Sequence, residues 1–322
     1  MRLLMSARNL NAVYSQPNMR RRYEVWFLRF GLADGSGAWW IRYLLLNLGR
    51  GGCDGHSRGM PVQVWATWFP RGGTPQSFVQ GFRAEGLSLS KRGASPLRLV
   101  HGENRVGEDS CQGMLTFEGH YLRWDLRYRS TFSGALSDRG WTGFSRTPHS
   151  DATFSGEIIF DGRTCRGDPL GYGLQGHNSS RRYRRMWTWT HAIFLDEDGP
   201  GLSSFEALEY EMALGMRYRR AALWLAREAH VFEKFENVRR VAENLTWAFE
   251  CTNKRKGLRL QATIEGGGPS CHRLPYVQTN CSGTFEVANN SLARATFVLS
   301  RPGLSSIEVA TEGAAVIEMA GA

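Results

Sequence analysis

The sequence contains no long hydrophobic run. None of its apolar stretches approaches the roughly 18 residues that a membrane-spanning helix requires. Residues 1–6 carry one cation and a short apolar segment, which is too little for a secretory signal peptide. We therefore predict a cytoplasmic protein with no transmembrane segment.

Cysteine is scarce, with six in 322 residues, and no two cysteines have the C-x-x-C spacing. Cys271, His272 and Cys281 lie near one another, but their spacing is not that of a zinc finger. We therefore predict no metal site, and we expect the cysteines to be free, partly buried thiols in a reducing compartment.

The sequence matches only part of a nucleotide-binding motif. Residues 171–176 spell G-x-G-x-x-G, but a dinucleotide site also needs a preceding strand and a following helix. Here Gly176 leads into the basic segment Arg181–Arg185, which looks too polar for a core, and then into a strand rich in Trp and Thr. We therefore predict no nucleotide cofactor.

The chain also lacks a concentrated basic surface motif, although its formal net charge is +10. Nearly all the cations are arginines, and they are scattered apart from a few short clusters. No RNA-binding motif or basic helix accompanies them. We predict no nucleic-acid partner and at most weak association with anionic surfaces, and the oligomeric state stays open.

Short alternating segments separated by glycine turns dominate what is present. In residues 121–128, Trp124, Leu126 and Tyr128 alternate with charged residues, as in a strand with one buried face. Asp34-Gly35 and Asp161-Gly162 are typical of hairpin turns. The pattern predicts an all-β protein, a barrel or sandwich, with one short helix at 236–243.

The segment 171–180 draws attention because it is glycine-rich and ends in polar side chains. We predict that it forms a turn, and that Gln175, His177 and Asn178 converge there at one end of a barrel. The alternative for His177 is a structural role without contact to a ligand.

The following segment, 187–191, alternates strictly, so that Trp187, Trp189 and His191 share one face of a strand. Large aromatic side chains with a few polar groups are typical of a small-molecule site. The alternative is a buried strand whose Trp side chains fill a barrel and whose His is a core residue.

Five motifs in order resemble one family. They are Tyr23-Glu24-Val25-Trp26, Trp40-Ile41-Arg42-Tyr43, Trp124-Asp125-Leu126-Arg127-Tyr128, His177-Asn178 before Trp187-Thr188-Trp189, and Leu274-Pro275-Tyr276 before Asn290-Ser291-Leu292-Ala293-Arg294. From about residue 22 to 300 the chain resembles the two-lipocalin-domain superfamily of hydroxyneurosporene synthase (carotenoid 1,2-hydratase), AttH-like proteins, tocopherol cyclases and some fungal Diels–Alderases.

The resemblance implies two consecutive lipocalin-like antiparallel β-barrels packed against each other, with at most one or two short helices and a pocket in or between them. The expected domains are an arm at 1–21, a first barrel at 22–180 and a second at 181–322. The implied activity is proton-initiated cyclisation, hydration or isomerisation of an apolar isoprenoid-like or polyketide-like substrate in a barrel pocket, without metal or organic cofactor. The alternative is a non-catalytic carrier of a lipophilic molecule.

Two positions near the candidate catalytic acid depart from the family pattern, whereas the acid itself is kept as Glu. Ser179 replaces the Trp of the hydratase signature, and Ser204 and Glu206 stand where the hydratases have Tyr-x-Asp. A short turn at 196–201 would place Glu206 within one or two cross-strand positions of His191. A register shift by one residue would instead turn Glu209 and Glu211 inward.

We therefore predict Glu206 as the proton donor, with its pKa raised by burial, and His177 and Asn178 at the pocket wall as the other catalytic residues. The alternative for Glu206 is an exposed strand carboxylate paired with one of the arginines. For Glu24 and Arg42 the alternative is a simple cross-strand ion pair. The predicted substrate-binding residues are Gln175, Trp187, Trp189, His191, Tyr210, Glu24, Trp26 and Arg42.

Overall fold

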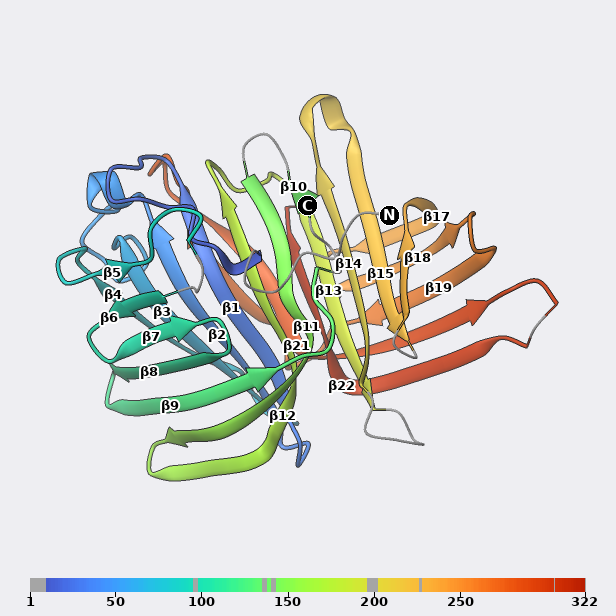
Figure 1. Cartoon of the computed structure of the whole chain (residues 1–322), viewed down its shortest axis with the longest axis horizontal. Helices are drawn as coiled ribbons and strands as arrows, with labels where there is room; N and C mark the ends of the chain where they lie inside the picture. Colours follow the sequence, from blue (N-terminus) through green and yellow to red (C-terminus); the bar gives the residue numbers. More distant parts are fainter. Residues whose placement is uncertain are drawn as a thin grey trace.

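The chain folds into two curled antiparallel sheets that lie side by side (Figure 1). The computed structural model describes residues 10–94, 98–134, 138–139, 143–195, 202–225, 228–303 and 305–321. Within these residues the regular structure is almost entirely strand, which confirms the predicted all-β class. No helix among them is long and apolar enough to cross a membrane.

The first sheet has the strand order β4-β3-β2-β1-β12-β11-β9-β8-β7-β6-β5, with β10 beside β11. Its described strands are β1 (Tyr23–Leu32), β2 (Gly37–Leu46), β3 (Val62–Pro70), β4 (Gln76–Phe82), β5 (Ser88–Leu89), β6 (Arg98–His101), β7 (Asn104–Gly107), β8 (Ser110–Phe117), β9 (His120–Arg129), β10 (Asp138–Arg139), β11 (Gly143–Phe160) and β12 (Arg163–Ser180). The 3-10 helix η1 (Leu48–Arg50) follows β2.

The second sheet has the order β16-β15-β14-β13-β22-β21-β19-β18-β17, with β20 beside β21. Its described strands are β13 (Trp187–Leu195), β14 (Leu202–Glu211), β15 (Arg217–Leu225), β16 (Glu228–Phe232), β17 (Lys234–Val241), β18 (Thr246–Asn253), β19 (Leu258–Glu265), β20 (His272–Val277), β21 (Thr284–Ser300) and β22 (Ile307–Ala320). The 3-10 helix η2 (Ala213–Gly215) follows β14.

Three apolar clusters divide the interior. One fills the first curled sheet, a second fills the other, and the third lies between the two sheets. Strand alternation produces this division: Trp26 and Leu28 of β1 point into the first sheet, while Val25 and Phe27 point toward the second. Both faces of the central strands are therefore buried.

The predicted turn at 171–180 is wrong, because these residues are the second half of the long strand β12. β12 lies between β1 and β11 and is hydrogen-bonded to both. Its glycines allow close packing: a Cβ at Gly173 would lie 1.8 Å from the carbonyl oxygen of Arg29, and one at Gly176 would lie 2.2 Å from the Phe27 ring. The glycines reflect strand packing rather than a turn.

The predicted helix at 236–243 is also wrong, since β17 covers most of it. Its Glu and Arg residues favour a helix locally, but pairing with β18 and packing of Phe235 and Val238 against the second core decide the outcome. The break in register between Glu236 and Arg239 is a bulge, with Asn237 at φ 51°.

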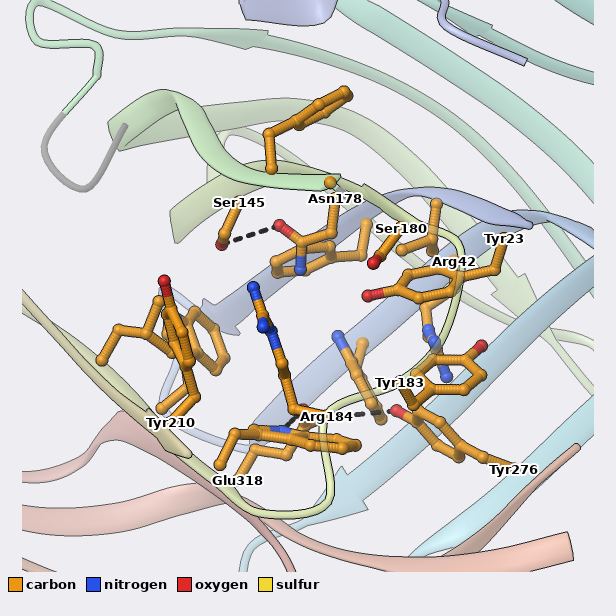
Figure 2. A pocket seen from close by; sticks show the side chains of 18 residues that line it. Tyr23, Arg42, Ser145, Asn178, Ser180, Tyr183, Arg184, Tyr210, Tyr276 and Glu318 are labelled. Atoms are coloured by element: carbon orange, nitrogen blue, oxygen red, sulfur yellow. Dashed lines mark hydrogen bonds between the residues drawn. The ribbon is translucent and has the colours of Figure 1, made fainter. Parts of the chain in front are cut away.

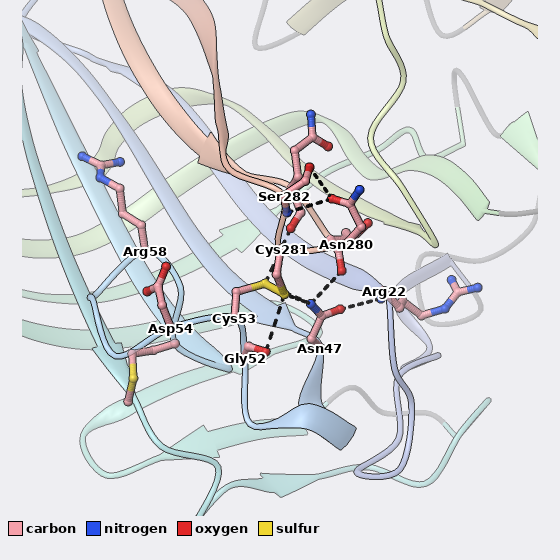
Figure 3. Close-up of a disulfide and its surroundings, with 12 residues drawn as sticks. Arg22, Asn47, Gly52, Cys53, Asp54, Arg58, Asn280, Cys281 and Ser282 are labelled. Carbon is pink, nitrogen blue, oxygen red and sulfur yellow. Dashed lines mark hydrogen bonds between the residues drawn. A yellow bond between two sulfur atoms is a disulfide. The ribbon is translucent and has the colours of Figure 1, made fainter.

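A disulfide between Cys53 and Cys281 links the two sheets (Figure 3). Cys53 follows η1 of the first half, and Cys281 lies between β20 and β21 of the second. Their Cα atoms are 5.2 Å apart, within the usual range for a disulfide. The prediction that all six cysteines are free is therefore wrong; those at 111, 165, 251 and 271 are free.

Candidate functional site

A cavity of about 120 Å³ lies between the two sheets, and its lining belongs largely to the third apolar cluster (Figure 2). It therefore lies between the two sheets, which is one of the two places that the resemblance implies, and not inside either sheet. The lining residues are Tyr23, Val25, Phe27, Trp40, Arg42, Gly143, Phe144, Ser145, Asn178, Ser180, Tyr183, Arg184, Trp187, Trp189, Leu208, Tyr210, Tyr276 and Glu318.

Glu318 of β22 is the carboxyl group that lines this cavity. Its Oε1 accepts a hydrogen bond of 2.8 Å from the Trp187 indole, and its Oε2 accepts one of 3.3 Å from the Tyr276 hydroxyl. Burial raises the pKa of Glu318 above its ordinary value, although Arg42 and the Trp187 indole act in the opposite direction. The site therefore favours a protonated carboxyl more than water does.

Sequence reasoning missed Glu318. It shares a strand face with Val316 and Ala320, which lie in the apolar cluster between the sheets, while Ile317 and Met319 point into the second core. The available signal was one charge, Glu318, in the stretch 314–320, which is otherwise apolar on both faces of the strand.

Arg42 of β2 lies against the cavity among aromatic rings. Its guanidinium carbon is 4.9 Å from the Trp40 ring centroid, 4.8 Å from that of Trp65 and 4.4 Å from that of Tyr276. Its Nη1 is buried and has no hydrogen-bond partner among the residues that the structure describes. The predicted ion pair with Glu24 is not formed, because the two side chains lie on opposite faces of the first sheet.

The basic segment 181–185 contributes to the cavity through Tyr183 and Arg184. Tyr183 stacks on Tyr23 with ring centroids 4.1 Å apart, and the Arg184 guanidinium lies 4.4 Å from the Tyr210 ring centroid. Figure 2 shows Arg184 extending into the cavity toward Asn178. Burial raises the pKa of Tyr23 to about 12, so its phenol remains a neutral donor.

Five of the predicted site residues line the cavity. Asn178 does so from β12, where its side-chain oxygen accepts a 2.9 Å hydrogen bond from Ser145. The other four come from β2, β13 and β14: Arg42, Trp187, Trp189 and Tyr210.

Four others point into the first sheet instead. His177 stacks on Trp26, and its Nε2 lies 2.8 Å from Glu24 Oε1. Gln175 exchanges hydrogen bonds of 3.0 Å with the Asn11 side chain. Adjacent residues of a strand face opposite sides, so His177 and Asn178 cannot both reach the same cavity.

Glu206 and His191 are direct cross-strand partners, in agreement with the predicted register. Neither lines the cavity. Glu206 accepts hydrogen bonds from Thr147 of β11 at 2.8 Å and from the Trp189 indole at 2.9 Å. Burial raises the pKa of Glu206 to about 7, as predicted in direction. The predicted turn at 196–201 lies outside the described residues.

His191 is buried, with Nε2 2.8 Å from the carbonyl oxygen of Ser150. Burial lowers its pKa to about 3, so the imidazole is neutral and Nε2 donates this hydrogen bond. The alternative register is wrong: Glu209 lies on the opposite face of β14 from Glu206, and it pairs with Arg219 at 3.0 Å.

Among the described residues, no group of three or more His, Cys, Asp and Glu side chains is placed to hold a metal ion. The polar groups at the cavity are instead arginine, phenol, amide and carboxyl side chains. These groups can bind oxygen atoms of a ligand and can exchange a proton.

No protein-family model matches the sequence, and no curated protein matches it. Solved structures do match. CghA with Sch210972 has a TM-score of 0.58 at 10% identity over 99% of this chain and 96% of that one. Kievitone hydratase from Nectria haematococca has a TM-score of 0.57 at 12% identity over 97% and 94%.

An AttH-like protein from Nitrosomonas europaea has a TM-score of 0.51 at 13% identity, over 96% of this chain and 94% of that one. An AttH-like protein, a hydratase and a Diels–Alderase are the kinds of protein that the sequence resembles, so the resemblance is confirmed at the level of the fold.

Proposed function

We propose that the chain is a cofactor-independent enzyme that protonates a largely apolar, isoprenoid-like or polyketide-like molecule between its two sheets. Protonation would initiate cyclisation, hydration or isomerisation. The observation that carries this proposal is Glu318, a carboxyl with a raised pKa that lines an aromatic cavity. It takes the role that the sequence suggested for Glu206.

The reaction begins when the Glu318 carboxyl gives its proton to a carbon–carbon double bond of the substrate. The carboxylate that remains is stabilised by hydrogen bonds from Trp187 and Tyr276. The π faces of Trp187 and Trp189 stabilise the carbocation. Glu318 is reprotonated by a proton lost from a neighbouring carbon in cyclisation or isomerisation, or by the attacking water in hydration.

Glu206 acts through Trp189 in this scheme. Its carboxyl accepts the Trp189 indole N–H from behind the cavity wall and so fixes the orientation of the ring. The fold is similar to that of a hydratase, and a hydratase adds water to a double bond. This similarity supports the proposed class of reaction.

The test is conversion of a panel of prenylated phenols and linear polyenes, followed by mass spectrometry in H₂¹⁸O and D₂O. We expect one class to be converted, with deuterium incorporated at carbon, and we expect E318Q to lower kcat at least 100-fold. The matched control is E286Q, since Glu286 is exposed on β21. Wild-type turnover by E318Q would overturn the assignment, and binding of the panel without conversion would favour the carrier function.

A further inference from the structure

We infer that the ligand of this cavity is an amphipathic anion, whose apolar body carries one carboxylate or enolate oxygen group that binds Arg42. This inference rests on the proposed function and specifies the substrate class. It differs from the expectation of a simply apolar substrate.

The first feature that points to an anion is the buried Arg42 side chain. Arg42 is only 4% exposed, and its buried Nη1 has no hydrogen-bond partner in the described part of the chain. Among the described residues it forms no ion pair with a carboxylate. A buried guanidinium N–H without an acceptor is costly, so the missing acceptor is expected from outside the chain.

The second feature is the shape of its surroundings. Trp40, Trp65 and Tyr276 surround the guanidinium and attract its charge through their π faces. They supply no acceptor to Nη1. The N–H groups of a guanidinium lie in its plane and match two oxygens that share one negative charge.

The third feature is the charge of the cavity. Arg42 and Arg184 bring two cations to the lining, against one carboxyl, Glu318, whose burial favours its neutral form. One negative charge on the ligand reduces this excess. A part of the wall that includes Val25, Phe27 and Leu208 is apolar and suits a hydrocarbon or aromatic body.

The experiment is calorimetric titration of the full chain with three matched probes, 2-naphthoate, 2-naphthamide and 2-naphthyl phosphate. The proteins are the wild type, R42M and R42K, with R273Q as the control because Arg273 is exposed on β20. We expect 2-naphthoate to bind the wild type and R273Q at least tenfold more tightly than the amide. In R42M this preference for the acid over the amide disappears. Lysine lacks the planar guanidinium group, so in R42K the logarithm of the affinity ratio falls to less than half of its wild-type value.

Equal affinity for acid and amide in the wild type, or an unchanged preference in R42M, would overturn the inference while leaving the cavity as a binding site. If 2-naphthyl phosphate bound more tightly than 2-naphthoate, and if this binding depended on Arg42, the assignment of a carboxylate or enolate ligand would be wrong. Failure of all three probes to bind at millimolar concentration would count against both this inference and the proposed function. R42K serves as the deciding variant where R42M does not fold.

Discussion

At the scale of single residues, Glu318 and Glu206 of the second sheet have different tasks. Glu318 faces the cavity, whereas Glu206 lies behind Trp189 and is hydrogen-bonded across the sheets to Thr147. Both have raised pKa values because burial disfavours the ion. Contact with the cavity, rather than pKa, distinguishes the proton donor from the positioning residue.

Glu206 makes the stability of the protein depend on pH. Its pKa is about 7 when folded and takes the ordinary value of 4.5 when unfolded. Between these values the folded protein holds a proton that the unfolded chain releases, so the free energy of unfolding falls as the pH rises. Glutamine cannot ionise, so we expect E206Q to exceed the wild type by up to about 3 kcal/mol at pH 8 and to match it within about 1 kcal/mol at pH 5.

Urea unfolding of both proteins at the two pH values measures this difference, and E286Q controls for a general effect of charge. If the free energies of unfolding of E206Q and the wild type differed by the same amount at both pH values, the predicted titration of Glu206 would be wrong.

The strand pattern predicts that Trp187 and Trp189 share one face, and both line the cavity. The alternation of Trp187 and Trp189 and the pairing of His191 with Glu206 follow from strand period and short-range antiparallel pairing. Glu318 could not be found this way, because its partners Trp187 and Tyr276 lie 131 and 42 residues away. Only the sheet topology brings these residues together.

At the scale of elements, the N-terminal segment and β12 form one unit. The carbonyl oxygen of Leu10 lies 2.8 Å from His177 Nδ1, and Tyr14 donates its backbone N–H to Glu24 at 2.8 Å. Asn11 pairs with Gln175. Gln175 and His177, which the sequence suggested as site residues, thus attach the arm to the interior of the first sheet.

We therefore expect H177A to change stability rather than chemistry. Loss of the imidazole leaves Glu24 and the Leu10 carbonyl each without one buried partner, which should lower the free energy of unfolding by about 2–4 kcal/mol. Naphthoate affinity should stay within about twofold of the wild type. Thermal unfolding and calorimetric titration measure the two effects, and N178A is the comparison because Asn178 faces the cavity.

A loss of binding in H177A without loss of stability would return His177 to the ligand site. The glycine-rich segment 171–180 predicts a turn, in which adjacent side chains can converge. For this reason the sequence places His177 at the ligand site. The pairing of β12 with β1 and β11 makes it a strand, and the faces then alternate.

At the scale of the whole molecule, polar contacts fasten the two sheets around the cavity. Arg29 of β1 is fully buried and donates from Nη1 to the carbonyl oxygen of Ala314 and from Nη2 to that of Ala315, each at 2.9 Å. Near the disulfide, Asn47 donates to the Thr279 carbonyl at 2.8 Å, and Thr279 donates to the Arg181 carbonyl at 2.7 Å. The loop that carries Tyr183 and Arg184 is therefore attached to both halves.

We expect the C53S/C281S double variant to be less stable by about 2–5 kcal/mol, because the disulfide joins positions 228 residues apart and restricts the unfolded chain. Denaturant unfolding with and without a reductant measures this loss. The wild type should lose a similar amount on reduction, and the variant should not respond. C165S is the control, since Cys165 is free. If the oxidised and reduced wild type had equal free energies of unfolding, the disulfide would not stabilise the protein.

The class of the fold followed from local signals, namely alternating faces and glycine turns, whereas the disulfide did not. Cys53 and Cys281 have no distinctive spacing and lie in loops of different halves. Their proximity results from the docking of the two sheets, which sequence periodicity does not report.

The same disulfide turns the polypeptide between residues 53 and 281 into a covalent ring that passes through both sheets. A protease that cuts this ring once, in any loop, opens it but releases nothing. The nicked protein should therefore migrate as one species on a non-reducing gel and as two on a reducing gel. A chain cut in this way keeps both walls of its cavity joined, so that a single break in the backbone does not separate Arg42 from Glu318.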